Sequence, residues 1–318
     1  MEAGQKDQAT LTTLDGHRVL LTAVASTPEE ACRAVGLGAE GIGLFTCEAL
    51  YREKDHPPTE EDLLALYGAL GATGAGRPAV IRLPDLDWHE WPAHDPEKNP
   101  ALGRRGIRLA LATPGLLQPQ LRAVLRAGAV HPVRLALPFV STISEVLQIK
   151  RLLQDLTREL DDSGQPCASP DLGLMADLPA VAAAFDIMAF EARFFHVGDN
   201  MLQYLLGTDQ GPADAGSPDP FDPAFLLQCR TLIENLHRRH KKVAVSAVIV
   251  REPAAIPVLI GLGFDELTVP AGLLAQTRQL VQQTRYNTAR LIAAKATSFW
   301  DPREARQYAT EALARVRI

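Results

Sequence analysis

The sequence predicts an α/β protein built as a (β/α)8 TIM barrel. Three observations point to this fold class. Eight short apolar runs alternate along the chain with stretches of helical periodicity, which is typical of a parallel sheet covered by helices. Several helical stretches begin at a Ser or Thr followed by acidic residues, the pattern of a helix N-terminus. The 318 residues leave room for eight strand–helix units in one domain.

The predicted strands are short and rich in Val, Leu and other apolar residues. They cover residues 19–25, 41–45, 78–83, 133–140, 172–177, 193–198, 243–249 and 265–270. Between them, helical periodicity covers residues 103–127 as one stretch. Thr59 is expected to cap the N-terminus of the helix over residues 58–70. Ser141 or Thr142 is expected to cap the long helix that begins at residue 143. A doubly wound open sheet is the alternative arrangement of these elements.

Composition argues against several classes of protein. The net charge of -6 and the pI of about 5.8 disfavour nucleic-acid binding, which requires a basic patch or stripe. No apolar run reaches the roughly 18 residues of a membrane span, and the polar N-terminus lacks the apolar stretch of a signal peptide. The four cysteines form no CxxC pair, so neither a disulfide framework nor a zinc site is expected. We therefore expect a reduced, cytoplasmic protein.

Chemistry in a TIM barrel is found at the carboxyl ends of the strands. The residues at those ends are Thr46, Cys47, Glu48, residues 82–87, Pro138, Phe139, Asp177, residues 198–200, Ser246 and Pro270. This set holds one arginine, several carboxylates and an amide. It offers neither a Ser-His-Asp arrangement nor a His-rich set of metal ligands, so these positions define a charged candidate site of another kind.

Six segments resemble, in order and roughly in spacing, the C-terminal barrel of the phosphoenolpyruvate-utilising enzymes. They are GAEGIGLFTCEALY, VIRLPDLD, NPALGRRGIR, GLMADLPAVAAAF, FFHVGDNMLQY and GLGFDELTVPAGLL. The likeness is greatest to enzyme I of the sugar phosphotransferase system and covers nearly the whole chain. It implies a barrel of the phosphoenolpyruvate/pyruvate superfamily over residues 19–285, a lead-in segment over 1–18 and closing helices over 286–318.

The resemblance also implies a chemistry. In this family several arginines, an Asn and a Mg²⁺ ion on two carboxylates hold phosphoenolpyruvate. The phosphoryl group passes to a histidine on a separate swivelling domain, and a cysteine then protonates the enolate to give pyruvate. Such transfer depends on positioning and charge neutralisation. The implied partners are a phosphohistidine domain or phosphocarrier on another chain, and the family's barrels pair as homodimers.

Part of the family's site is kept in this sequence. The resemblance assigns substrate binding to Arg82, Arg105 and Asn200. It assigns the metal to Asp177, which replaces a glutamate, with Asp199 as the only candidate for the second metal carboxylate. Retention of these residues implies that a remnant of the anion site persists and binds a small carboxylate or phosphate weakly.

Other family positions are changed. The phosphate-binding arginine of the GLYRTE motif is Thr46, and a second arginine is Gln210. The proton-donating cysteine falls on Ser246, whose hydroxyl is a far weaker acid than a thiol. Cys47 lies on another strand and is no replacement. The glycines Gly38, Gly41 and Gly43 are kept, and we expect them to serve the turn into the strand and close packing there, a role that requires no arginine.

Three functions remain open. The chain is a phosphoenolpyruvate-binding component with an impaired catalytic set, a catalytically inert regulatory or assembly partner of an active phosphotransferase, or an altered lyase acting on pyruvate-like substrates. The full phosphotransfer reaction is not expected from the chain alone.

Structural roles are also open for the kept residues. Arg82 and Arg105 could pair with Asp85 and Asp87, while Asp177 and Asn200 could each cap the following helix. Elsewhere, His196 is expected in the core or at the barrel mouth and not as a base, and His89, Glu90 and His94 fit no zinc motif.

Overall fold

The computed structural model is a closed barrel of eight parallel strands, in the order β1 to β8 around the barrel. It describes residues 10–52, 56–73, 76–87, 97, 99, 102–208 and 218–316, the last without its side chain. The strands are β1 (Leu20–Ala25), β2 (Ile42–Phe45), β3 (Ala79–Arg82), β4 (Val133–Leu137), β5 (Asp171–Met175), β6 (Phe194–Val197), β7 (Lys242–Val245) and β8 (Glu266–Pro270). β1 pairs with β8 and closes the barrel, which confirms the predicted fold class and excludes the open sheet.

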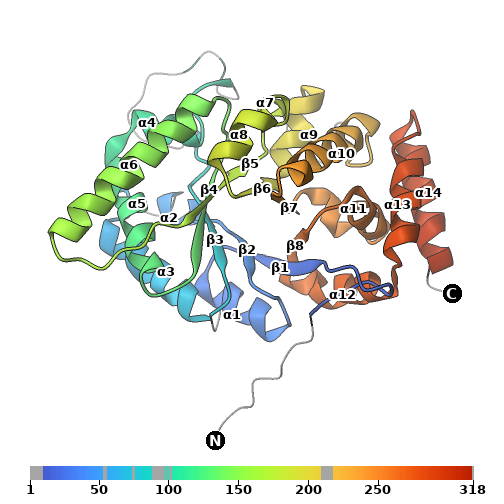
Figure 1. The fold of residues 1–318 in the computed structure, drawn as a ribbon, viewed down its shortest axis with the longest axis horizontal. Coiled ribbons are helices and arrows are strands. Elements are labelled where there is room, and N and C mark those ends of the chain that lie inside the picture. Colours follow the sequence, from blue (N-terminus) through green and yellow to red (C-terminus); the bar gives the residue numbers. More distant parts are fainter. Residues whose placement is uncertain are drawn as a thin grey trace, which may run out of the picture.

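Helices surround the barrel, as Figure 1 shows. In the described residues they are α1 (Pro28–Gly36), α2 (Glu48–Arg52), α3 (Glu60–Thr73), α4 (Ile107–Ala112), α5 (Pro114–Gly128), α6 (Ile143–Asp162), α7 (Pro179–Ala183), α8 (Phe185–Glu191), α9 (Asp199–Leu206), α10 (Pro223–Arg238), α11 (Ala255–Leu262), α12 (Leu274–Gln283), α13 (Tyr286–Ala296) and α14 (Pro302–Val316), together with the 3-10 helices η3 (Val248–Arg251) and η4 (Ala271–Leu273). α13 and α14 pack on α11 at the edge of the molecule. Among the described residues, none of the helices combines the length and the apolar character needed to cross a membrane.

All eight predicted strands are present, with ends shifted by a few residues. The helical periodicity over 103–127 is confirmed, and two helices, α4 and α5, share this stretch. Pro114 begins α5 and has no N–H to continue the hydrogen bonding of α4, so the chain turns at Thr113. Thr59 and Thr142 do begin their helices: the Thr59 hydroxyl accepts from the Asp62 N–H at 3.2 Å, and Thr142 is the N-cap of α6.

Glycines in the first motif make room for the barrel wall. Gly38 has φ +100°, in the left-handed region that favours glycine, at the turn into β2. A Cβ on Gly43 would lie 2.1 Å from the Thr22 hydroxyl and 2.4 Å from that of Thr268, both inside the barrel. A Cβ on Gly41 would lie 2.9 Å from the Pro78 carbonyl oxygen. The expected packing role of these glycines is therefore confirmed, and it requires no arginine nearby.

The barrel interior contains a small apolar cluster and a buried histidine. A small apolar cluster fills its middle, made by Leu44, Val80, Ala136, Met175 and Phe194. His196 is fully buried near this cluster, and neither of its ring nitrogens has a hydrogen-bond partner among the described residues. Burial, with a smaller contribution from the nearby charge of Arg82, lowers the pKa of His196 to about 3, so the ring is neutral. The expectation that His196 is a core residue is confirmed.

Candidate functional site

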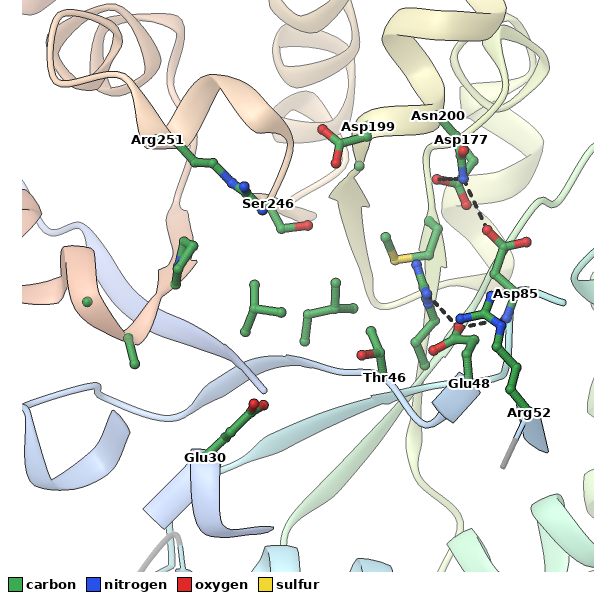
Figure 2. Close-up of a pocket in the computed structure, with 18 of the residues that line it drawn as sticks. Glu30, Thr46, Glu48, Arg52, Asp85, Asp177, Asp199, Asn200, Ser246 and Arg251 are labelled. Atoms are coloured by element: carbon green, nitrogen blue, oxygen red, sulfur yellow. Dashed lines mark hydrogen bonds and ion pairs between the residues drawn. The ribbon is translucent and has the colours of Figure 1, made fainter. Parts of the chain in front are cut away.

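A pocket of about 660 Å³ opens at the carboxyl ends of the strands. Its wall includes seven of the eight residues that the sequence singled out for binding, metal and catalysis: Thr46, Arg82, Arg105, Asp177, Asp199, Asn200 and Ser246. The eighth, Gln210, lies outside the described residues, as do His89, Glu90 and His94. Barrel closure thus gathers side chains from positions 46 to 246 around one space, and Figure 2 shows the labelled ones ringing it.

Arg82 stands at the end of β3 and is paired with Glu48, the first residue of α2. The Arg82 Nη2 donates to Glu48 Oε1 at 2.6 Å, and the same oxygen accepts the Asp85 backbone N–H at 2.8 Å. Burial alone would lower the pKa of Arg82, but the charges of Glu48 and Asp85 outweigh it and raise that pKa. The Arg82 Nε is buried and has no hydrogen-bond partner among the described residues. Arg82 is therefore a charged, buried cation that still has an unused donor.

Arg105 approaches from the loop before α4 and grips Asp85 with two nitrogens. Its Nε donates to Asp85 Oδ1 and its Nη2 to Asp85 Oδ2, both at 2.9 Å. Two parallel bonds of this kind fix a guanidinium more firmly than one. The Arg105 Nη2 also donates to Asn200 Oδ1 at 3.1 Å, which links the loop before α4 to α9.

Asn200 connects three side chains that are far apart in the sequence. Its Nδ2 donates to Asp85 Oδ2 and to Asp177 Oδ1, each at 3.2 Å. The other oxygen of Asp177 accepts the Phe139 backbone N–H at 3.0 Å, and Asp177 is 1% exposed. Figure 2 shows this chain of contacts from Asp177 through Asn200 to Asp85 on one side of the pocket.

These contacts decide the structural alternatives. Asp177 does not cap α7, because Leu178 is the residue before that helix and no side-chain cap bond is formed. Asn200 lies inside α9, where Gly198 takes the cap position. Both capping hypotheses are wrong, because each side chain turns toward the pocket and bonds there. The pairing hypothesis holds for Arg105 with Asp85, whereas the partner of Arg82 is Glu48.

The two aspartates of this network carry different charge states. Burial acts to raise the pKa of Asp85, but the hydrogen bonds and charge of Arg105, together with Arg82, hold it below its usual value. Burial and, to a smaller extent, the charge of Asp85 raise the pKa of Asp177 to about 6, although Arg82 and the hydrogen bonds from Phe139 and Asn200 act to lower it. Asp177 therefore changes protonation state near neutral pH, which few carboxyl groups do.

At Thr46 and Ser246, the pocket wall has neutral side chains where the resemblance implies reactive ones. The Thr46 and Ser26 hydroxyls form a hydrogen bond at 2.9 Å, and Ser246 follows β7 in the pocket wall. Asp199 accepts the Val248 N–H, and burial raises its pKa. Cys47 lies outside the pocket wall, buried against Tyr67 and Gln120, and burial raises its pKa to about 12. As expected, its thiol does not replace the missing proton donor.

Sequence reasoning missed the role of Phe139. Its φ is +59°, which is uncommon for a residue with a side chain, and its ring lies 5.1 Å from the guanidinium carbons of both Arg105 and Arg108. Its N–H is the one that Asp177 accepts. Position at a strand end marked Phe139 as a candidate, but no sequence pattern reports a backbone angle.

Comparison with known proteins identifies the family. The sequence profile described as "PEP-utilising enzyme, PEP-binding domain" matches residues 1–286. The chain belongs to the PEP-utilising enzymes. It is 35% identical over 290 residues to the phosphoenolpyruvate-protein phosphotransferase of Staphylococcus carnosus, covering 89% of this chain and 51% of that protein. It is 36% identical over 275 residues to the multiphosphoryl transfer protein of Xanthomonas campestris, covering 84% of this chain and 32% of that one.

This PEP-utilising enzyme barrel therefore spans about half the length, or less, of the curated relatives it matches. Among solved structures, a citrate lyase from Burkholderia xenovorans is similar with a TM-score of 0.54 and 15% identity, over 94% of this chain and 91% of that one. At that identity the likeness shows the barrel fold alone.

Proposed function

We propose that this PEP-utilising enzyme barrel binds a small anion of the phosphoenolpyruvate or pyruvate class, weakly, at the mouth of the barrel. The observation that supports the proposal most is the pair of arginines, Arg82 and Arg105, held in the pocket wall next to Asn200. Guanidinium groups are suited to carboxylate and phosphate oxygens, and both arginines keep nitrogens that make no ion pair with Glu48 or Asp85. The chain thus acts as a binding component and does not complete phosphotransfer alone.

A second function, an inert regulatory or assembly partner of an active phosphotransferase, is favoured by the charge balance. The described pocket wall carries five arginines, at 33, 52, 82, 105 and 251, and five carboxylates, at 30, 48, 85, 177 and 199. Their formal charges cancel. A pocket with no net charge attracts an anion only at arginines that have no carboxylate beside them. A barrel that binds no anion is therefore consistent with this charge balance.

Mg²⁺ is proposed to enter only together with an anion. No group of three or more His, Cys, Asp or Glu side chains in the described part of the chain is arranged to hold a metal ion. The residues that would hold it are Asp177 and Asp199, and Mg²⁺ commonly takes one or two carboxylates and completes its shell with water and substrate oxygens. Bound there, it would neutralise charge on the anion. Asp177 already accepts two hydrogen bonds, so Mg²⁺ without the anion is not expected to bind.

The proposal extends to partners, assembly and location. A phosphohistidine domain or phosphocarrier on another chain would supply the group that this chain lacks, and the cytoplasm suits four cysteines that are all free. By analogy with the family we propose a homodimer. Light scattering at micromolar concentration should give twice the 34.5 kDa chain mass, whereas a clean monomer would contradict the dimer.

Anion binding is tested by thermal shift and calorimetry with phosphoenolpyruvate, oxalate and phosphate. We expect dissociation constants on the order of millimolar, which correspond to about 4 kcal/mol. Thr46→Arg should tighten binding about tenfold, because one charge-assisted hydrogen bond is worth about 1.5–3 kcal/mol. Thr46→Gln is the matched control, of similar reach without the charge. Wild-type protein with no shift at about ten times that constant would refute the binding proposal and leave the inert partner.

Binding should also depend on pH through Asp177. Its pKa of about 6 means that lowering the pH through that value removes one negative charge from the pocket. Oxalate stays a dianion in this range, and we expect its affinity to rise about tenfold as the pH falls. That change corresponds to oxalate shifting the pKa of Asp177 by about one unit. Titrations across this range measure it, and Asp177→Asn should abolish the dependence. Affinity that is constant or falls toward acid pH would contradict the assignment.

A further inference from the structure

The pocket has a second cationic side that the family's motifs do not explain. Arg33 of α1 and Arg251 at the end of η3 both line it. They lie at positions to which the resemblance assigns nothing, and neither belongs to the network around Asn200. Figure 2 places Arg251 and Glu30 on one side of the space, with Asp85, Asp177 and Asn200 on the other.

These two arginines differ in their pairing from Arg82 and Arg105, whose side chains are 16% and 24% exposed. Arg82 and Arg105 each hold a carboxylate at 2.6–2.9 Å. Arg33 and Arg251 are exposed, and within the described chain neither guanidinium has an ion pair or hydrogen bond. Of the carboxylates in the pocket wall, Glu30 accepts the Ser26 N–H and Asp199 accepts the Val248 N–H, and neither forms an ion pair with these two arginines. The charge of Arg251 reaches Asp199 and acts to lower its pKa, against burial, which raises it.

The size of the pocket is consistent with a ligand that reaches both sides. About 660 Å³ is room for roughly twenty waters at their liquid volume. Phosphoenolpyruvate fills only part of that space. The remaining space is bordered by Arg33 of α1 and Arg251 of η3, which could meet the rest of a longer ligand.

We propose that the pocket binds a linear dianion whose two anionic ends are separated by several carbon atoms. One end meets Arg82 and Arg105, and the other meets Arg33 and Arg251. Arg33 and Arg251 are then specificity-determining residues that select ligand length. The inference rests on the proposed anion-binding function, because it uses the same buried arginines for one end.

The test compares oxalate with the longer dicarboxylates succinate and glutarate, by calorimetry at constant ionic strength and without metal. We expect a longer diacid to bind wild-type protein about fivefold more tightly than oxalate, since each exposed ion pair contributes modestly. The double variant Arg33→Gln/Arg251→Gln should lose that advantage and keep its oxalate affinity within about twofold. Arg151→Gln, an exposed arginine on α6 outside the pocket wall, is the control and should behave as wild type.

Each outcome has a distinct meaning. Oxalate that binds as well as or better than both longer diacids would overturn the length selection and leave the proposed function standing. A double variant that weakens all ligands equally would show only a general charge effect and would also overturn it. If no dianion binds the wild type, the proposed function fails together with the inference.

Discussion

No pyruvate is expected to form when this chain is given phosphoenolpyruvate, Mg²⁺ and a separately purified phosphohistidine domain. Two changes at the described pocket account for this: Thr46 where the family has a phosphate-binding arginine, and Ser246 where it has the proton-donating cysteine. The family's arginines are missing at Thr46 and at Gln210. Losing both removes roughly 3–6 kcal/mol of anion-binding free energy, or about 10²–10⁴ in affinity. A lactate dehydrogenase-coupled assay measures the product.

The assay requires a matched positive control. An active full-length phosphotransferase, run with the same histidine domain, shows that the coupled system reports turnover. The variant Thr46→Arg/Ser246→Cys returns two of the family's groups to the pocket and is the variant most expected to show residual activity. Steady turnover by the wild type would contradict the prediction and would mean that Asp199 and some other acid have taken over the lost roles.

Removing the side chain of Arg82 should destabilise the fold strongly. Arg82→Ala leaves Glu48, whose side chain is 9% exposed, with the Asp85 N–H as its remaining hydrogen-bond donor. Breaking a buried ion pair from one side typically lowers the free energy of unfolding by about 3–5 kcal/mol, because the remaining charge stays buried. Urea denaturation followed by circular dichroism measures the change. Since Arg82 supports the barrel mouth, its Ala variant cannot serve as a clean test of ligand binding.

Two further variants separate charge burial from loss of packing. Arg82→Ala combined with Glu48→Gln removes both charges and should recover a substantial part of the lost stability. Arg303→Ala breaks an ion pair to Asp301 in which the arginine side chain is 86% exposed, and it should leave unfolding unchanged. If Arg82→Ala is as stable as wild type, or if the Glu48→Gln addition destabilises it further, the buried pair does not have the role assigned to it.

The sequence alone was sufficient for the barrel and for the place of the site. Periodicity of apolar residues specifies which faces are buried, and alternation of strands with helices specifies a parallel sheet. The carboxyl ends of eight strands then had to meet, so Thr46, Asp177 and Ser246 could be placed around one pocket in advance. The break between α4 and α5 was missed although Pro114 was visible, because apolar spacing runs through both helices.

Only the tertiary structure decided how the site residues are used. Periodicity does not specify the side-chain directions on which two contacts depend. One is the hydrogen bond between Asn200 and Asp85, which are 115 positions apart, and the other is the pairing of Arg82 with Glu48. The same holds for Phe139, whose left-handed backbone directs its N–H to Asp177. Arg33 and Arg251 carried no motif, and they share a pocket only because β1 pairs with β8 and closes the barrel. Closure brings distant residues together, whereas sequence spacing reports only what lies nearby along one element.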